Sequence, residues 1–171
     1  AIVKAQWASK KAITGVIIGA DTVVVDGEEL LGKPRSMEEA WEMLRRLRGR
    51  EHRVITGVAV IDGSGGKPMT AYRTTDVWMR EYTDQEIETY IRSGEPWDKA
   101  GGYGVQDLFL RPAARISGCY LNVVGLPPCT LLTLLSRLGL SVLPGPQWDP
   151  PWECHDCRGW VQAQGGGRAR L

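Results

Sequence analysis

The stretch from Val16 to Val25 constrains the fold more than any other part of the sequence. Valine and isoleucine dominate this stretch, and such a β-branched run is typical of a buried strand. Asp21 lies in its middle, where a buried carboxylate costs on the order of several kcal/mol unless a cation or hydrogen bonds compensate it. Asp21 is therefore predicted to be either a functional carboxylate or one that caps a neighbouring loop.

Helical and strand patterns alternate along the rest of the sequence. The segments Arg53 to Ile61 and Met69 to Met79 predict two strands of a hairpin, because a glycine-rich loop separates them. Ser36 and Thr83 each stand three residues before a glutamate, which is the pattern of a capping box at the start of a helix. Interleaved helices and strands around a hairpin predict an α/β fold with a mixed, twisted sheet flanked by helices. Three further elements are predicted: a helix around Gln6 to Ala12, a strand from Gly118 to Val124, and a helix that Pro127 opens.

The composition narrows the classes of protein. The 171 residues correspond to about one domain, and 21 basic against 20 acidic residues give a net charge of +1. Neither sign forms a long block, which argues against a nucleic-acid-coating protein. No apolar stretch reaches the roughly 18 residues of a membrane span, and no signal-peptide pattern stands at the start. We therefore expect a cytoplasmic protein with reduced cysteines and with neither nucleic acid nor membrane as a partner.

The composition changes once, at Pro144. Pro144 is the first of four prolines within eight residues, and a run of three glycines comes later. This predicts a globular domain over residues 1–143 and a loosely ordered, Pro/Gly-rich tail over residues 144–171. The tail carries Cys154 and Cys157 in a Cys-x-x-Cys pattern around His155. A complete zinc site needs further ligands, so an incidental pair and an intermolecular half-site both stay open.

Two lysines stand beside glycines in predicted loops. Lys33 follows Gly32, and Lys99 precedes the run from Ala100 to Gly104. Glycines let a ligand approach the backbone closely, lysines pair with phosphate, and a carboxylate such as Asp21 can hold the accompanying Mg²⁺. Each lysine alone could equally be a solvated surface charge. The chain contains no Gly-x-x-x-x-Gly-Lys-Ser/Thr, so neither segment is a P-loop.

Eight short motifs follow one another between about Gln6 and Leu138. They are Ile18-Gly19-Ala20-Asp21-Thr22-Val23-Val24, Asp26-Gly27-Glu28, Leu31-Gly32-Lys33-Pro34, Ile55-Thr56-Gly57-Val58, Ser93-Gly94-Glu95-Pro96, Asp98-Lys99-Ala100-Gly101, Tyr103-Gly104-Val105-Gln106 and Asn122-Val123-Val124-Gly125-Leu126-Pro127. Together they closely resemble the Maf family of nucleoside triphosphate pyrophosphatases. The resemblance implies a Maf/ITPase-like fold and a house-cleaning hydrolase. Such an enzyme cleaves the bond between the α- and β-phosphates of a nucleoside triphosphate with the help of a divalent metal.

The resemblance implies a catalytic residue and two specificity residues. Asp21 matches the family's proton acceptor, and a role as metal ligand stays open beside it. Thr22 and Gln106 match two positions that the family ties to base selection, in the branch that acts on dTTP and UTP. A hydroxyl and an amide suit a pyrimidine base, since they can pair with the O4, N3–H and O2 groups of thymine or uracil.

The resemblance also implies a phosphate site and a cofactor. Lys33 and Lys99 match lysines that line the phosphate site, and Lys11 matches another in the preceding helix, although its spacing to Asp21 is shorter than is usual in the family. The implied cofactor is Mg²⁺ or Mn²⁺, and the implied partner is a nucleoside triphosphate. A homodimer stays open.

One family element is absent from the sequence. Maf proteins begin with a strand and a Ser-x-Ser-Pro-Arg-Arg loop, and the resemblance starts downstream of that loop. An N-terminally truncated sequence is therefore expected, and the activity of these 171 residues by themselves stays open. Two other classes of function stay open as well: a non-catalytic nucleotide-binding remnant of the fold, and an interaction protein acting through its Cys- and Trp-bearing tail.

Three remaining residues are given structural interpretations. His52 stands at the entry to a predicted strand, where a structural role is favoured over a catalytic one. Cys119 and Cys129 lie in apolar surroundings and are predicted to be buried thiols.

Overall fold

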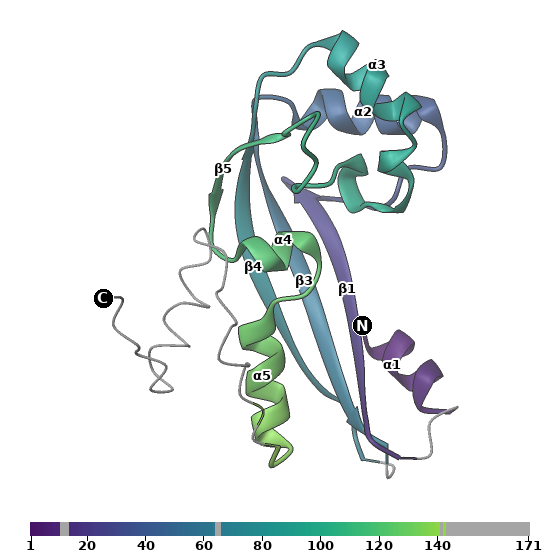
Figure 1. Ribbon diagram of the computed structural model, residues 1–171, viewed down its shortest axis with the longest axis vertical. Helices are drawn as coiled ribbons and strands as arrows, with labels where there is room; N and C mark the ends of the chain where they lie inside the picture. Colours follow the sequence, from purple (N-terminus) through teal and green to yellow (C-terminus); the bar gives the residue numbers. More distant parts are fainter. Residues whose placement is uncertain (11–13, 64–65, 141, 143–171) are drawn as a thin grey trace. The chain divides into compact units, whose positions relative to one another are not determined.

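The computed structural model describes residues 1–10, 14–63, 66–140 and 142. Five strands form one sheet in the order β2-β1-β3-β4-β5 (Figure 1). The strands are β1 (Val16–Asp26), β2 (Glu29–Leu31), β3 (Glu51–Asp62), β4 (Met69–Met79) and β5 (Ala113–Ser117). The α-helices are α1 (Ile2–Ser9), α2 (Met37–Leu47), α3 (Asp84–Arg92), α4 (Tyr120–Val124) and α5 (Pro128–Arg137), and the short 3₁₀ helices are η1 (Glu95–Asp98) and η2 (Ala100–Gly102). The predicted α/β fold with helices flanking a sheet is confirmed.

Two strand pairs have a defined register. β1 pairs with β2 around the turn at Asp26-Gly27, and β4 pairs with β5. Both pairs are antiparallel, and no parallel pair occurs among the pairs whose register the structure describes. The register of the β4–β5 ladder shifts between Trp78 and Met79, which pair with Arg115 and Ala113.

The chain divides into two compact units. Unit 1 comprises Ala1–Asp21, Thr56–Arg73 and Gly118–Leu171, and unit 2 comprises Thr22–Ile55 and Thr74–Ser117. β1, β3 and β4 each contribute residues to both units, so Asp21 and Thr22 fall into different units although they are adjacent in the chain. The boundary of a tail at residue 144 stays a prediction, because residues 143–171 lie outside the described part.

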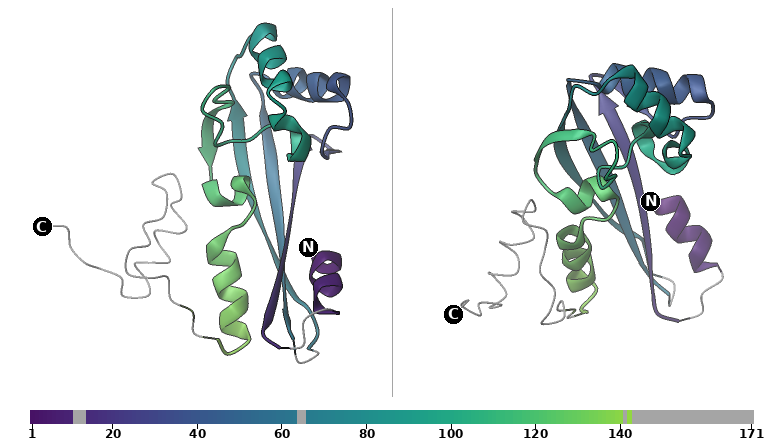
Figure 2. Two further views of the ribbon diagram at one scale, coloured as in Figure 1. Left: turned by 45° about the vertical axis from the view of Figure 1, so that its right-hand side comes forward. Right: turned by 45° about the horizontal axis from the view of Figure 1, so that its top comes forward.

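Unit 1 has a two-sided core built on alternate residues of β3. Ala59 and Ile61 pack with Ala5 of α1, whereas Val58 and Val60 pack with leucines of α5. Successive side chains of a strand point to opposite faces, so α1 and α5 cover opposite faces of this part of the sheet, as the left view of Figure 2 shows.

Unit 2 gathers α2 and α3 side by side (Figure 1). The start of α3 is a complete capping box, in which the Thr83 side chain accepts from the Glu86 backbone and Glu86 accepts in return. At α2 only half of the predicted box forms: Ser36 accepts from the Glu39 backbone, but the Glu39 carboxylate accepts from the backbone N–H of Arg35. The predicted starts of both helices are confirmed.

Two predicted elements differ from the structure. The prediction of a strand from Gly118 to Val124 is wrong, because the strand β5 ends at Ser117 and the helix α4 follows it. Asn122 of α4 is buried and is joined to Thr56 of β3 by two hydrogen bonds, so tertiary contacts override the strand preference of the local sequence. The helix predicted around Gln6 to Ala12 begins earlier, at Ile2, and ends at Ser9.

Among the described residues, none of the helices combines the length and the hydrophobicity that a bilayer span requires.

Candidate functional site

Asp21 lies at the surface of unit 1, which corrects the expectation of a buried carboxylate. Its side chain is 51% exposed, and the ammonium of Lys4 donates to Asp21 Oδ1 over 2.5 Å. Ile17 and Asp21 lie on the same face of β1, because side chains alternate along a strand. Ile17 is buried by packing on α1, whereas Asp21 lies further along the strand, where it reaches solvent and the side chain of Lys4. The carboxylate is therefore accessible to a ligand without any rearrangement of the core.

Thr22 points to the opposite face of β1, because side chains alternate along a strand. It is half-buried in unit 2. Val24 shares its face and lies against Gly101, where a Cβ would come within 3.0 Å of Val24 Cγ2. Gly101 also has a φ of +70°, which favours glycine. The glycine-rich loop from Lys99 to Gln106 thus covers the face of β1 to which Thr22 belongs.

Lys99 is a constrained cation. Its side chain is 21% exposed, and its ammonium donates to the Glu95 carboxylate over 3.0 Å, the Glu95 carbonyl over 2.7 Å and the Asp98 carboxylate over 2.8 Å. Partial burial lowers the pKa of Lys99, but the hydrogen bonds to Asp98 and Glu95 outweigh burial and raise it above its ordinary value. The hydrogen bond from Lys99 lowers the pKa of Asp98, and the charge of Lys33 acts in the same direction.

The glycine-rich loop brings the other predicted residues of unit 2 near Lys99. A Cβ at Gly104 would lie 2.9 Å from Lys99 Cε and 3.8 Å from Gln106 Oε1, so both side chains pass close to this backbone. The N–H of Gly101 donates to the carbonyl of Gly32, the residue before Lys33, over 2.9 Å. Lys33 and Gln106 are both exposed. The loop and the neighbouring Lys33 therefore offer two cations and an amide around a glycine-rich backbone.

Two buried tyrosines, Tyr90 of α3 and Tyr103 of the loop itself, fix this loop through their hydroxyl groups. The Gly104 N–H donates to the hydroxyl of Tyr90 over 3.0 Å. Tyr103 is 5% exposed, and its hydroxyl lies 2.6 Å from Nε2 of the buried His52. Burial raises the pKa of Tyr90 to about 12 and raises the pKa of Tyr103 further, and burial lowers the pKa of His52 to about 4. All three groups are therefore neutral at pH 7.

The sequence interpretation assigned no role to Tyr90 or Tyr103. The available signal was that Tyr103 is the one large side chain in the run Ala100 to Gly104. The structural interpretation of His52 agrees with its burial. Cys119 is a buried thiol as predicted, whereas Cys129 is only partly buried, and neither forms a disulfide.

The sequence also suggested a phosphate-binding lysine near the start of the chain and a possible zinc-binding pair in the tail. Lys11 lies outside the described residues, as do Cys154, His155 and Cys157 of the predicted tail. Within the described ranges, no group of three or more histidine, cysteine, aspartate or glutamate side chains is arranged to hold a metal ion. A single accessible carboxylate such as Asp21 nevertheless fits Mg²⁺, which is usually bound by one or two carboxylates, water and substrate phosphates.

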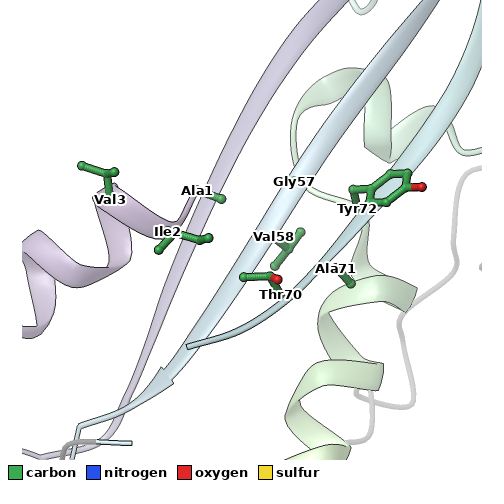
Figure 3. Close-up of a pocket in the computed structure, with 8 residues that line it drawn as sticks. All are labelled: Ala1, Ile2, Val3, Gly57, Val58, Thr70, Ala71 and Tyr72. Atoms are coloured by element: carbon green, nitrogen blue, oxygen red, sulfur yellow. The ribbon is translucent and has the colours of Figure 1, made fainter. Parts of the chain in front are cut away.

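A cavity of about 700 Å³ lies in unit 1, and its lining reaches Asp21, because the amino group of the lining residue Ala1 lies 4.0 Å from Asp21 Oδ2. Its eight described lining residues come from the start of α1, from β3 and from β4 (Figure 3). Thr70 and Tyr72 supply the polar side chains, and no lining side chain is charged. The side chains of this lining suit an apolar group.

Comparisons with known proteins confirm the family resemblance that the sequence motifs indicated. The sequence matches the family of Maf-like proteins over residues 1–138. A relative from Dehalococcoides mccartyi strain CBDB1, named dTTP/UTP pyrophosphatase, is 44% identical over 156 residues, which cover 91% of this chain and 70% of the relative. Relatives of the same name from Dictyoglomus thermophilum and Carboxydothermus hydrogenoformans are 46% and 47% identical, over 84% and 80% of this chain and 74% and 73% of their own lengths. The chain belongs to the Maf family.

Proposed function

We propose that the protein is a nucleoside triphosphate pyrophosphatase that hydrolyses dTTP and UTP, with modified pyrimidine nucleotides as further substrates. The bond between the α- and β-phosphates is cleaved, and the products are the nucleoside monophosphate and pyrophosphate. The observation that carries the proposal is the identity of 44–47% to relatives named dTTP/UTP pyrophosphatase over at least 80% of this chain. The contacts around Asp21 and the glycine-rich loop support it.

In the proposed mechanism, Asp21 orients the attacking water and accepts its proton. The water oxygen forms a bond to phosphorus, and the bond between the α- and β-phosphates breaks as the electron pair leaves with pyrophosphate. The exposure of Asp21 supports this role, because the water and the substrate must both reach the carboxylate. A carboxylate acting as general base contributes about 10²–10⁴-fold to the rate.

Lysines of unit 2 are proposed to bind the phosphates. Lys33 is exposed, and among the described residues no recorded hydrogen bond holds its ammonium, so the ammonium can turn toward a phosphate oxygen. Lys99 is held by Glu95 and Asp98, which aim its ammonium but also compete with the phosphate for it. Charge-assisted hydrogen bonds of this kind are roughly twice as strong as neutral ones.

Thr22 and Gln106 are proposed to select the base. A pyrimidine offers O4, N3–H and O2, and the Gln106 amide can both donate to and accept from that edge. Thr22 lies on the face of β1 that the loop of Gln106 covers, which supports a shared role. Both residues belong to unit 2.

A divalent metal, Mg²⁺ or Mn²⁺, is the proposed cofactor, and Asp21 would hold it together with the substrate phosphates. When bound, such an ion neutralises the charge that develops on the phosphate oxygens. We further expect a role in removing unwanted nucleotides from the cytoplasm.

The test is an assay of pyrophosphate release by the protein from dTTP, UTP, dATP and dGTP, with and without added Mg²⁺. Higher kcat/KM for dTTP and UTP than for the two purine nucleotides is expected. Equal turnover of all four would contradict the pyrimidine assignment, and binding without release would instead indicate a non-catalytic nucleotide-binding protein.

A further inference from the structure

His52 and Tyr103 form a buried polar pair that the proposed chemistry does not use. His52 is 2% exposed on β3, and its Nε2 lies 2.6 Å from the Tyr103 hydroxyl. The two rings meet edge to face, with their centroids 5.5 Å apart and an angle of 83° between their planes. Among the described residues, Nδ1 of His52 has no hydrogen-bond partner.

This pair is not the most stable way to fill its space. One hydrogen bond joins two groups that between them carry two polar hydrogens, so one of these hydrogens stays unpaired in a buried site. Unpaired buried polar groups lower stability, and two apolar side chains of similar shape would avoid the loss. What the hydrogen bond provides is a fixed position for the Tyr103 ring.

The segment that Tyr103 fixes is intrinsically flexible. Three of the five residues from Ala100 to Gly104 are glycine, and glycine restricts the backbone least. Two hydrogen bonds also anchor it, one from Gly101 to the carbonyl of Gly32 and one from Gly104 to the Tyr90 hydroxyl. The contact with His52 adds an anchor to the central sheet through β3.

The same segment joins the two residues that we propose to read the nucleotide. Lys99 precedes it, Gln106 follows two residues after it, and both side chains lie close to Gly104. A shift of this backbone therefore moves an ammonium and an amide together. Displacements of about 1 Å at such groups are enough to cost a large part of a binding or catalytic interaction.

We infer that His52 and Tyr103 are positioning residues, which hold the glycine-rich loop on β3 so that the side chains of Lys99 and Gln106 are correctly placed to contact the nucleotide. Neither side chain contacts the substrate. The part of the inference that concerns the nucleotide rests on the proposed function, whereas the holding of the loop does not.

The first measurement is hydrogen exchange of the loop amides without nucleotide. Tyr103→Phe removes the hydroxyl and keeps the ring, and we expect exchange at Gly101, Gly102 and Gly104 to quicken about tenfold. The matched control is Tyr82→Phe. Tyr82 is an equally buried tyrosine of unit 2, and its hydroxyl donates over 2.7 Å to the carbonyl of Leu44 rather than to the loop, so its loss should leave loop exchange unchanged.

The second measurement is the discrimination between dTTP and dATP, taken as the ratio of kcat/KM values. Tyr103→Phe and His52→Leu should lower this ratio and raise KM for dTTP about tenfold, while Tyr82→Phe lowers the thermal midpoint but keeps the ratio. His52→Gln should restore much of the ratio, because the glutamine amide can still bond the Tyr103 hydroxyl. A protein that is merely less stable keeps the discrimination of its folded fraction, so this ratio separates positioning from stability.

Each outcome decides between the two claims. If Tyr103→Phe and Tyr82→Phe behave alike in exchange, the pair does not hold the loop and the inference is wrong. If exchange quickens but discrimination is unchanged, the pair holds the loop without positioning the specificity residues, which also overturns the inference. If the wild-type protein releases no pyrophosphate, the proposed function fails, and loop exchange by itself then supports or overturns the anchoring by His52. Should His52→Leu fail to fold, Tyr103→Phe and His52→Gln carry the same comparison.

Discussion

The surroundings of Asp21 in unit 1 and those of the glycine-rich loop in unit 2 are built in opposite ways. Asp21 is half-exposed and meets an exposed lysine, while the nearby core of α1, β1 and β3 is apolar. Below the loop, polar groups are buried: Tyr90 bonds Gly104, and Tyr103 bonds His52. The proposed catalytic group therefore lies on the surface of an apolar core, whereas the residues proposed to bind the nucleotide lie on a loop that buried hydrogen bonds hold.

This difference predicts how chemistry and stability separate. A surface ion pair such as Lys4–Asp21 contributes about 0–1 kcal/mol, so substitutions at Asp21 should change activity and leave folding almost untouched. Buried hydrogen-bonded groups cost more to disturb. Substitutions beneath the loop should therefore change stability and function together.

The largest expected effect is that of Asp21→Asn. The variant keeps the size of the side chain but removes the negative charge. It therefore cannot accept the proton from water, and it binds a metal ion more weakly than the carboxylate does. Pyrophosphate release from dTTP should fall about 100-fold or more, and the thermal midpoint should stay within about a degree or two. Steady-state kinetics and calorimetry check both values.

Lys4→Met is the matched control for this variant. It removes the ion pair with Asp21 while leaving the carboxylate in place. Stability should again hardly change, and activity should stay well above that of Asp21→Asn. Near wild-type turnover of Asp21→Asn would remove the residue from the mechanism.

The second effect concerns acid pH and unit 2. Burial lowers the pKa of His52 from 6.5 to about 4, against the opposing charge of Asp26. As the pH falls from 7 to 4.5, the unfolded chain protonates this histidine and the folded chain does not. The stability from neutral His52 is full above pH 6.5 and is lost as the pH falls toward 4. The expected loss over this range is about 2 kcal/mol, or roughly 30-fold in the folding equilibrium.

Urea unfolding at several pH values measures this loss. His52→Gln should flatten the dependence between pH 7 and 4.5, and His155→Gln provides a background in which His52 is the one titrating histidine. Glu86 does not interfere, because hydrogen bonds from Arg80 and Thr83 lower its pKa to about 2, so its contribution is lost at lower pH. An unchanged slope in His52→Gln would mean that His52 is not the source.

Local sequence patterns predicted much of the fold and less of the site. The capping residues Ser36 and Thr83 and the β-branched run of β1 act within a few residues, so they could be read directly. The helix α4 could not, because the contacts between Asn122 and Thr56 join positions 66 residues apart. Local propensity does not contain such contacts.

The site shows the same limit. Asp21, Lys99 and Gln106 were predicted as site residues from motifs, but the exposure of Asp21 depends on how much of β1 the helix α1 covers. The pairing of Tyr103 with His52 spans 51 residues. Motifs and the family resemblance thus selected the residues that we propose to carry the chemistry, but they did not contain the long-range packing around those residues.

The third effect compares two lysines of unit 2. Lys99→Met should raise KM for dTTP about tenfold, the lower end of what one charge-assisted phosphate contact contributes, because Glu95 and Asp98 already occupy part of its bonding capacity. Lys33→Met should raise KM only a few-fold, since an exposed and unconstrained ammonium loses more freedom on binding. A larger effect at Lys33 would mean that the carboxylates around Lys99 keep it away from the phosphates.

The smallest effect, a few-fold change, is expected for Gln106→Ala. The side chain is exposed, so its loss should leave the thermal midpoint unchanged, in contrast to substitutions of the tyrosines beneath the same loop. If its amide meets the pyrimidine edge, the ratio of kcat/KM for dTTP over dATP should fall about three- to tenfold, the value of one neutral hydrogen bond. The inhibition constant of inorganic triphosphate, used as a competitive inhibitor, should not change, because that ligand has no base.

The variant Gln106→Glu sharpens the test. A carboxylate cannot donate to O4, so this variant should reproduce the loss if donation matters and restore the ratio if acceptance from N3–H is the contact. Unchanged discrimination in both variants would remove Gln106 from base selection, and an unstable Gln106→Ala would show that the surface of the loop is as tightly coupled to the fold as its buried side.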